Sequence, residues 1–492
     1  MGVVLAIALL GLLAAGLWWT WRRPFIGLGL LVAGFAFHSF LLMVLLQLGT
    51  PSVLVRAFQG WKEILIAALT LIVLMRIWQE LRSGRSVSLL FTDWVAIGLA
   101  ILTIVYFLLP ESVLHSGTNF AQRLVGFRFT ALIPLMYFLA RRVQPAGDRD
   151  LRAVLWLAMS AGAIVGLFGA FELFFVPTRT WIDWGVNQYT QILGFIYKGP
   201  GGLPPNFFVT LPDGTLLRRV VSTYISPLGV AYTGLMLFPL GVVLVDRQRA
   251  GSRVRWLAIA ALTLVVVGVM FAVTRLALFA LVGEAALLWL LLRRPWIAAL
   301  VPVLIVATAL MLYPYASLGP AVDRNLNEVK RTHWQWAISG SDSSAQEHYG
   351  FLAADLKFDL QHPLGLGTGA STARYGQLVG TGESAVLGMF GDLGIAGGAL
   401  YVLFYLLAIW NGWRAYRSLP RDSLAVALPL TALVGGLALL PVTVTSDVWG
   451  DLSVTYLLWW AAGASATLAS RRSASPAVAR TPVVPSPIRP VA

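Results

Sequence analysis

Charged residues are scarce in this chain, and cysteine is absent. Of the 492 residues only 12% are charged and 58% are hydrophobic, whereas a soluble globular chain carries about 25% charged residues. This deficit excludes an ordinary soluble fold. Without cysteine, the chain forms no disulfide and offers no thiolate for catalysis or metal binding.

Nucleotide-binding and metal-binding motifs are also missing. The sequence contains no P-loop and no GxGxxG segment after a strand, and no HExxH or similar spacing of metal ligands. We therefore expect no cofactor and no metal. The energy for a reaction would have to arrive in an activated substrate delivered by the membrane.

Long apolar runs fill most of the sequence. Runs of about 17 to 25 residues suffice to cross roughly 30 Å of hydrocarbon as helices. The sequence thus predicts an all-α fold, a polytopic membrane bundle of about 13 spans. They lie near residues 3–20, 25–48, 64–78, 89–109, 129–140, 153–176, 226–245, 256–273, 276–292, 296–315, 385–410, 424–445 and 452–470.

The basic residues cluster between alternate apolar runs, as positive-inside sorting predicts. This sorting accounts for most of the net charge of +14, so we expect the lipid bilayer and no nucleic acid as a partner. The amino terminus is then outside, and residues 3–20 are a retained first span. The alternation requires that the run 256–292 be split at Thr274 and Arg275, because an arginine in the middle of a span is costly.

These spans and loops divide the chain into six regions. They are the N-terminal helices 1–176, a first outer loop 177–222, core helices 223–315, a large outer loop 316–384, C-terminal helices 385–470 and a disordered cytoplasmic tail 471–492. The large loop is the polar centre of the sequence, with three of the five histidines. Its segment 323–338 predicts a short helix on the membrane surface, from which Trp336 could stack on a sugar ring.

Several arginines fall on the predicted outer side, where inside-sorting does not explain them. Arg218 and Arg219 precede a span, Arg275 lies at the tight turn before another, and Arg128 follows a short outer loop. A guanidinium group suits a diphosphate, because its planar donors pair with two phosphate oxygens. The alternative is that each arginine anchors a helix end at the membrane interface.

The stretch 359–397 combines a glycine-dense loop with a carboxylate. The backbone at Gly367, in PLGLGTG, could approach a ligand closely. Glu383 stands just before the apolar run that begins at Ala385, at the predicted start of a helix. It could act as a general base towards an acceptor hydroxyl, or it could simply interact with the helix dipole.

The order of these motifs resembles the C-terminal core of the O-antigen ligase and polymerase superfamily. Members share an Arg before one span, a Thr/Ser-Arg at the next outer turn, a Pro-Leu-x-Gly-x-Gly loop and an acidic-x-Gly-Ile-x-Gly segment. The matching positions here are Arg218 or Arg219, Thr274-Arg275, 363–369 and 392–397. The resemblance covers roughly residues 218–410. Ligases of the superfamily carry a His-Asn pair where this chain has Glu383-Ser384, which is closer to the polymerases, and His348 stands where many members have an Arg.

The resemblance implies a glycosyltransferase of the GT-C type in a bacterial inner membrane, with its site facing the periplasm. The donor would be an oligosaccharide on undecaprenyl diphosphate and the acceptor a hydroxyl of another glycan. Arg219, Arg218 and Arg275 would hold the diphosphate, with His348 and Arg128 as further contacts, and Glu383 would deprotonate the acceptor. The reaction would invert the anomeric carbon without a metal. We also consider a chain-length regulator as a partner.

Two alternatives stay open on the sequence alone. The first keeps the chemistry but makes the chain a ligase to lipid A core or protein. The second is a transporter, in which Glu284, predicted midway along a span, would line an alternating-access path. The concentration of polar residues outside the spans favours the enzyme over the transporter. The sugar and its linkage are not specified by the sequence.

Overall fold

The computed structural model describes residues 2–84, 86, 88–194, 197, 202–210, 216–312, 315, 343–371 and 383–474. Twelve helical segments in these ranges are long and apolar enough to cross a membrane, and a thirteenth apolar helix, Pro295–Met311, is shorter. The predicted all-α fold is confirmed, and the chain is a multi-pass membrane protein.

The long helices are α1 (Gly2–Arg22), α2 (Ile26–Gln47), α4 (Trp61–Arg82), α5 (Phe91–Leu108), α7 (Phe120–Arg142), α8 (Asp148–Phe175), α11 (Pro227–Asp246), α12 (Arg253–Phe271), α13 (Arg275–Leu292), α14 (Pro295–Leu312), α16 (Ser343–Gln361), α17 (Ala385–Ser418) and α20 (Leu452–Ala474). The short helices are α3 (Ser52–Gln59), α6 (Glu111–Leu114), α9 (Thr178–Asp183), α10 (Val186–Ile192), α18 (Ala427–Leu430) and α19 (Gly436–Thr445). Between α18 and α19 lies a π-helical turn, η8 (Thr431–Gly435).

The remaining elements are single turns and one small hairpin. The turns are η2 (Pro205–Phe207), η3 (Ser222–Tyr224), η7 (Leu424–Val426) and η9 (Val448–Gly450). Strand β1 (Phe208–Thr210) pairs antiparallel with β2 (Leu216–Arg218), so that Phe208 lies opposite Arg218. The hairpin lies in the predicted loop 177–222, where the sequence had indicated no strand.

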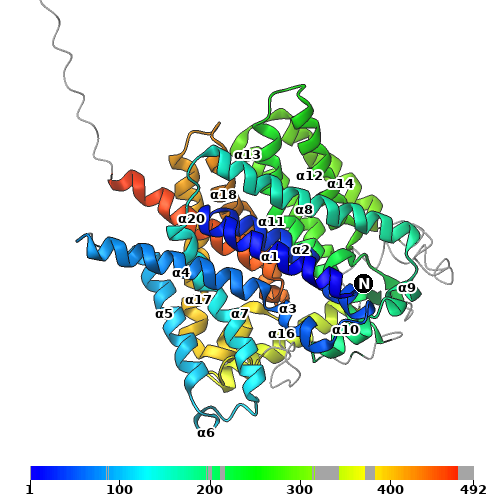
Figure 1. Cartoon of the computed structure of the whole chain (residues 1–492), viewed down its shortest axis with the longest axis vertical. Helices are drawn as coiled ribbons and strands as arrows, with labels where there is room; N and C mark the ends of the chain where they lie inside the picture. Colours follow the sequence, from blue (N-terminus) through cyan, green and yellow to red (C-terminus); the bar gives the residue numbers. More distant parts are fainter. Residues whose placement is uncertain are drawn as a thin grey trace, which may run out of the picture.

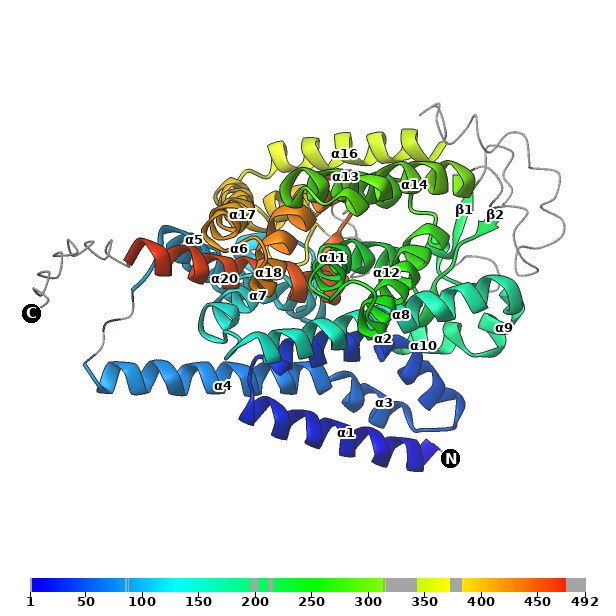
Figure 2. The same ribbon diagram turned by 90° about the horizontal axis from the view of Figure 1, so that it is seen from above.

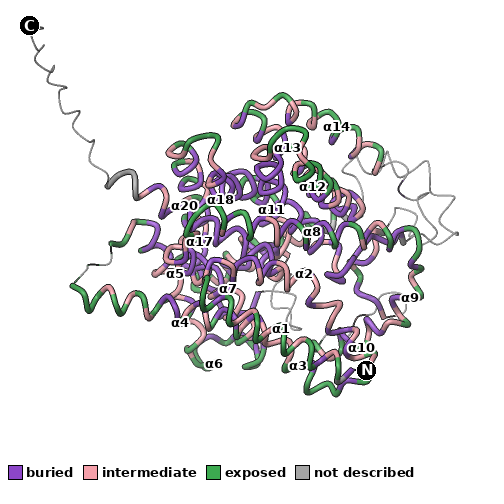
Figure 3. Tube along the Cα trace, turned by 45° about the horizontal axis from the view of Figure 1, so that its top comes forward, coloured by how far each residue is buried: buried purple, intermediate pink, exposed green. Residues whose placement is uncertain are grey.

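The centre of the bundle consists of helices that are buried on every side. Helices α11 and α20 are almost wholly buried, as is most of the segment from α18 to α19, whereas α1 is mostly exposed. Figure 3 shows this arrangement, with buried backbone around α11, α18 and α20 and exposed backbone along α3, α4 and α6. An apolar periphery of this kind is what a bundle surrounded by lipid requires.

The helices run between two ends of the bundle. In Figure 1 the C-terminal ends of α4 and α20 point to one side, while α9 and α10 lie on the opposite side. The first side carries Arg82, which agrees with the predicted grouping of basic residues at one end. Helix α16 packs against α17, and Figure 2 shows it on the opposite face of the bundle from α1.

Most predicted spans are confirmed with shifted ends. Helix α12 ends at Phe271 and α13 begins at Arg275, so the predicted split at Thr274 and Arg275 is correct. The span predicted at 129–140 was too short, since α7 begins at Phe120. Arginines interrupted the apolar pattern there. Helix α20 continues to Ala474, four residues into the tail predicted as disordered, and 475–492 lie outside the described residues.

Candidate functional site

The start of α17 carries the candidate base. Ser384 is the N-cap of this helix, and its hydroxyl accepts a hydrogen bond from the backbone N–H of Leu387 at 3.1 Å. The next residue, Ala385, donates its N–H to the carbonyl of Ser446 at 3.2 Å, beyond the end of α19. Glu383 therefore precedes a well-anchored helix start, which confirms its predicted position.

His348 of α16 contacts this carboxylate. Its Nδ1 lies 2.7 Å from Oε2 of Glu383, and the two side chains are 47% and 34% exposed. Both groups can therefore be reached from solvent. A carboxylate in contact with an imidazole can accept a proton from a hydroxyl and share it with the ring. The sequence singled out both residues but assigned His348 to phosphate, and it did not predict that they touch.

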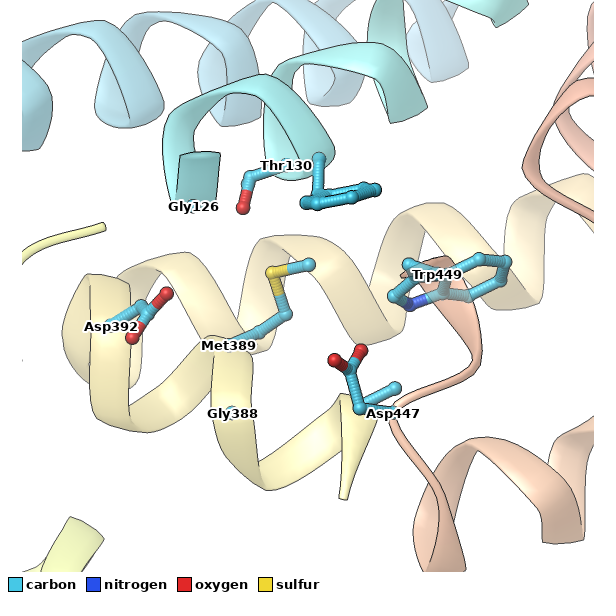
Figure 4. Close-up of a pocket in the computed structure, with 9 residues that line it drawn as sticks. Gly126, Thr130, Gly388, Met389, Asp392, Asp447 and Trp449 are labelled. Carbon is cyan, nitrogen blue, oxygen red and sulfur yellow. The ribbon is translucent and has the colours of Figure 1, made fainter. Parts of the chain in front are cut away.

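A cleft lies between α7 and α17, beginning at Ala385. The cleft is small, with a cavity volume of about 30 Å³. Figure 4 shows Thr130 of α7 facing Met389 of α17, with Asp392 at one end and Asp447 and Trp449 at the other. The cleft is thus lined by two carboxylates and an aromatic ring. Its lining on α17 begins at Ala385, two residues after Glu383 along the chain. The sequence had not indicated a role for Asp447 or Trp449.

The glycine-rich loop 363–369 is bound to α17 through its backbone. Gly367 donates its N–H to the carbonyl of Asp392 at 2.9 Å, and Ile395 donates to the carbonyl of Pro363 at 2.9 Å. The helix is broken at Gly394, whose φ of 68° opens it to receive the loop. Two of the four motifs that carried the family resemblance, 363–369 and 392–397, therefore form one structural unit.

The side chain of Asp392 completes this unit. Its carboxylate accepts hydrogen bonds from the N–H of Gly369 at 2.7 Å, the N–H of Ser371 at 2.9 Å and the hydroxyl of Ser371 at 2.7 Å. Gly367 has a φ of 100°, and a Cβ added to it would lie 2.7 Å from Leu114 Cδ1. The structure thus gives Gly367 a packing role, and its predicted approach to a ligand stays a prediction.

Arg219 lies against the turn between α12 and α13. Its Nε donates to the carbonyl of Ala272 at 2.9 Å, and its Nη2 donates to the hydroxyl of Thr274. Arg275, which begins α13, is close enough for its charge to act on Arg219. The arginine before one span and the Thr-Arg of the next turn, two separate motifs in the sequence, are therefore adjacent in space.

Burial lowers the pKa of Arg219 to about 10, and the positive charge of Arg275 acts in the same direction. The phenolic oxygens of Tyr232 and Tyr315 oppose this lowering of the pKa. A pKa of about 10 still leaves the guanidinium protonated near neutral pH. Arg219 therefore stays charged beside the turn that leads into Arg275. Guanidinium groups suit an anionic ligand, because their N–H donors form charge-assisted hydrogen bonds with its oxygens.

The backbone around Arg219 is strained. Ile225 has a φ of 55° and Val273 a φ of 45°, and both are β-branched residues that rarely adopt the left-handed region. Ser222, with a φ of 48°, is a third such residue. Each of these conformations costs about 1–3 kcal/mol and persists only where the surroundings impose it. They flank the two segments that position Arg219 and Arg275.

Arg218 points to a different partner. It forms a buried ion pair with Glu172 of α8, with Nη2 3.7 Å from Oε1. The same carboxylate accepts the N–H groups of Val221 at 3.2 Å and Ser222 at 2.7 Å, so it holds the strained segment in place. Glu172 was missed by the sequence analysis because it follows an apolar run near a predicted helix end. The one feature of the sequence that could have pointed to Glu172 is a single carboxylate within an apolar segment.

The other predicted residues lie in separate places. Arg128 of α7 contacts Glu63 of α4, with Nη1 3.3 Å from Oε1. Glu284 is fully buried in α13, and neither of its carboxylate oxygens has a hydrogen-bond partner among the described residues. Trp336 and the helix predicted at 323–338 lie outside the described residues.

Within the ranges that the structure describes, no group of three or more acidic, histidine or cysteine side chains could hold a metal ion. A comparison of the chain with models of known protein families and with curated protein sequences returns no match.

Proposed function

We propose that the chain is a membrane glycosyltransferase that moves an oligosaccharide from undecaprenyl diphosphate to a hydroxyl of another glycan, as a polysaccharide polymerase of the bacterial inner membrane. The contact between His348 and Glu383 carries this proposal. It joins two residues that the sequence singled out, 35 positions apart, and Ala385, two residues after Glu383, lines a cleft with polar groups. The resemblance to the O-antigen ligase and polymerase superfamily adds support.

The reaction assigns one role to each group. Glu383 removes the proton of the acceptor hydroxyl, and the acceptor oxygen forms a bond to the anomeric carbon of the donor sugar. The bond from that carbon to the diphosphate oxygen breaks, and the electron pair leaves with the diphosphate. A single displacement inverts the anomeric carbon. His348 orients the carboxylate and shares the proton that it receives.

The diphosphate binds to Arg219 and Arg275 in this proposal. Negative charge increases on the leaving diphosphate during the displacement, and fixed guanidinium groups stabilise it. Arg219 is assigned to this role in preference to Arg218 because Glu172 already neutralises Arg218 inside the fold. The site faces the periplasm, where lipid-linked sugars replace nucleotide sugars as donors.

The ligase alternative uses the same groups and differs only in the acceptor. A transporter would require polar groups along a path through the bundle. Among the described carboxylates, Glu284 lies deep in a span with neither oxygen hydrogen-bonded, while Glu383, Arg219 and Arg275 lie near helix ends. This distribution favours the transferase.

The test is glycan elongation by the full-length protein in membranes with a lipid-linked repeat unit as donor. Glu383→Gln and Arg275→Ala should each abolish elongation while the protein is still inserted. Asp183→Asn and Arg179→Ala are matched controls, because these α9 side chains are 63% and 89% exposed, and both should elongate normally. Unchanged product length in Glu383→Gln and Arg275→Ala would exclude the site. Transfer of a single unit to lipid A core without elongation would identify a ligase.

A further inference from the structure

A second polar cluster lies where α3 and α4 meet α2 and α7. Lys62, at the start of α4, is only 4% exposed, and its ammonium donates to the carbonyl of Gln59 at 2.6 Å. Its Nζ also lies 3.4 Å from Oε2 of Glu63, and Oε1 of Glu63 lies 3.3 Å from Arg128. A buried lysine is unfavourable unless it is paired, and these contacts pair Lys62 and bring two cations to one carboxylate.

Two polar atoms of the cluster lack partners. Gln59 Nε2 and Arg128 Nε are both buried without a hydrogen bond in the described part of the chain. Both are N–H donors. A buried N–H donor without a partner is unfavourable, and two such donors in one cluster indicate a place for a missing ligand.

His38 of α2 contributes a further donor. Its Nδ1 accepts a hydrogen bond from Nε1 of Trp61 at 3.0 Å, so the neutral ring carries its proton on Nε2. The charges of Lys62 and Arg128 both act on this ring, which places it close to both cations. The cluster therefore offers an excess of donors and, with two cations and one carboxylate, a net charge of +1.

An excess of N–H donors with net positive charge fits an anion with several acceptor oxygens, of which a phosphate group is the common example. The ligand can approach from the lipid side, because Arg128 and Glu63 are 39% and 41% exposed. Leu54, Ile64 and Leu124, which flank the cluster along the chain, are exposed apolar residues. Exposed apolar side chains beside an anion site suit a ligand that has both a phosphate group and a hydrocarbon chain.

We propose that the cluster formed by His38, Gln59, Lys62, Glu63 and Arg128 is a second anion site, which binds the phosphate headgroup of an isoprenoid diphosphate lipid. This assignment rests on the proposed function, in which such a lipid carries the acceptor glycan. A polymerase whose acceptor is itself lipid-linked must hold two diphosphates at once. Arg219 and Arg275 bind the one that leaves, and the α2–α4–α7 cluster binds the one that stays.

The test uses the purified full-length protein in detergent with farnesyl diphosphate as the probe, and native mass spectrometry counts the bound molecules. Wild type should bind two. Arg128→Gln should bind one, with affinity for the second weakened about tenfold or more by loss of a charge-assisted hydrogen bond. Glu63→Gln should keep both and tighten the second, because it removes a repelling carboxylate. The exposed Arg56 of α3 provides the matched control, and Arg56→Gln should bind two.

Three outcomes would overturn the proposal: two molecules bound by Arg128→Gln, weaker binding in Glu63→Gln, or inorganic pyrophosphate binding at this cluster as tightly as farnesyl diphosphate. The last result would mean a site for a free anion rather than for a lipid. Arg275→Ala separates this inference from the proposed function. If that variant still binds two molecules while Arg128→Gln binds one, the cluster is a lipid site and the diphosphate role of Arg275 fails.

Discussion

Nδ1 of His348 lies 2.7 Å from Oε2 of Glu383, across the gap between α16 and the start of α17. Neither residue belongs to a long motif, and no regular spacing connects them. The contact makes α16 part of the candidate site, since the helix supplies one member of an acid–base pair. A chain-length regulator or an acceptor glycan that moved α16 would therefore also act on Glu383.

We expect the effects of changing these two residues to overlap. Glu383→Gln should slow elongation by about 10²–10⁴-fold, as loss of a general base does. His348→Gln should slow it less, about tenfold, because the base remains but loses its partner. Since both act in one proton transfer, the double variant should be no slower than Glu383→Gln alone. Initial elongation rates of the single and double variants test this expectation. A rate loss in the double variant equal to the product of the two single losses would show that the residues act independently.

Arg219 should not tolerate replacement by lysine. Its guanidinium donates to Ala272 and Thr274 in different directions, and a lysine ammonium cannot reproduce that planar arrangement. Arg219→Lys should lower elongation about tenfold or more although the charge is kept. The rate should be measured at saturating donor with protein level matched, and Arg179→Lys on the surface of α9 provides the control. If Arg219→Lys elongates at the wild-type rate, then Arg219 contributes only its positive charge.

The break in α17 should depend on glycine at position 394. A Cβ there would lie 2.6 Å from the backbone carbon of Leu364, and the φ of 68° disfavours any side chain. Gly394→Ala should destabilise the protein by about 1–3 kcal/mol and loosen the loop 363–369. Gly283→Ala is the matched control, because that helical glycine has no atom within 4 Å of the added Cβ. Thermal unfolding in detergent distinguishes them, and equal melting temperatures would contradict the described pairing.

The amino-acid sequence predicts the helical segments better than the contacts between them. It found the split before Arg275 and the helix start after Glu383, because both depend on local features, a charge between apolar runs and the end of a polar loop. It could not find the ion pair of Glu172 with Arg218, since 46 residues separate them along the chain. The contact of His348 with Glu383 depends in the same way on how α16 packs on α17.

The stability of the protein should fall between acid and neutral pH because of Asp359 in α16. Burial raises the pKa of this carboxyl to about 7, and the charges of Asp355 and Asp392 add to the rise. The folded state therefore binds the proton more tightly than the unfolded chain, whose Asp titrates near a pKa of about 3.9. The stabilisation is fully present below about pH 4 and is lost as the pH rises through about 7.

Melting temperatures at pH 5 and pH 8 test this dependence on Asp359. Wild type should melt at a lower temperature at pH 8, and Asp359→Asn should show a smaller difference between the two pH values. Asp183→Asn, which alters an exposed carboxylate of α9, should keep the wild-type difference. An unchanged difference in Asp359→Asn would assign the pH dependence to another group.

In the proposed reaction, Arg219 and Glu383 serve one reaction chamber on the outer side of the membrane. The absence of cysteine makes single-cysteine labelling unambiguous. Three exposed positions report on the two sides: Pro205, next to the carbonyl acceptor of Arg219; Tyr349, next to His348; and Arg249, at the opposite end of α11. With a membrane-impermeant maleimide on intact cells, Pro205→Cys and Tyr349→Cys should react and Arg249→Cys should react only after permeabilisation. Labelling of Pro205→Cys and Tyr349→Cys from opposite sides would contradict the account.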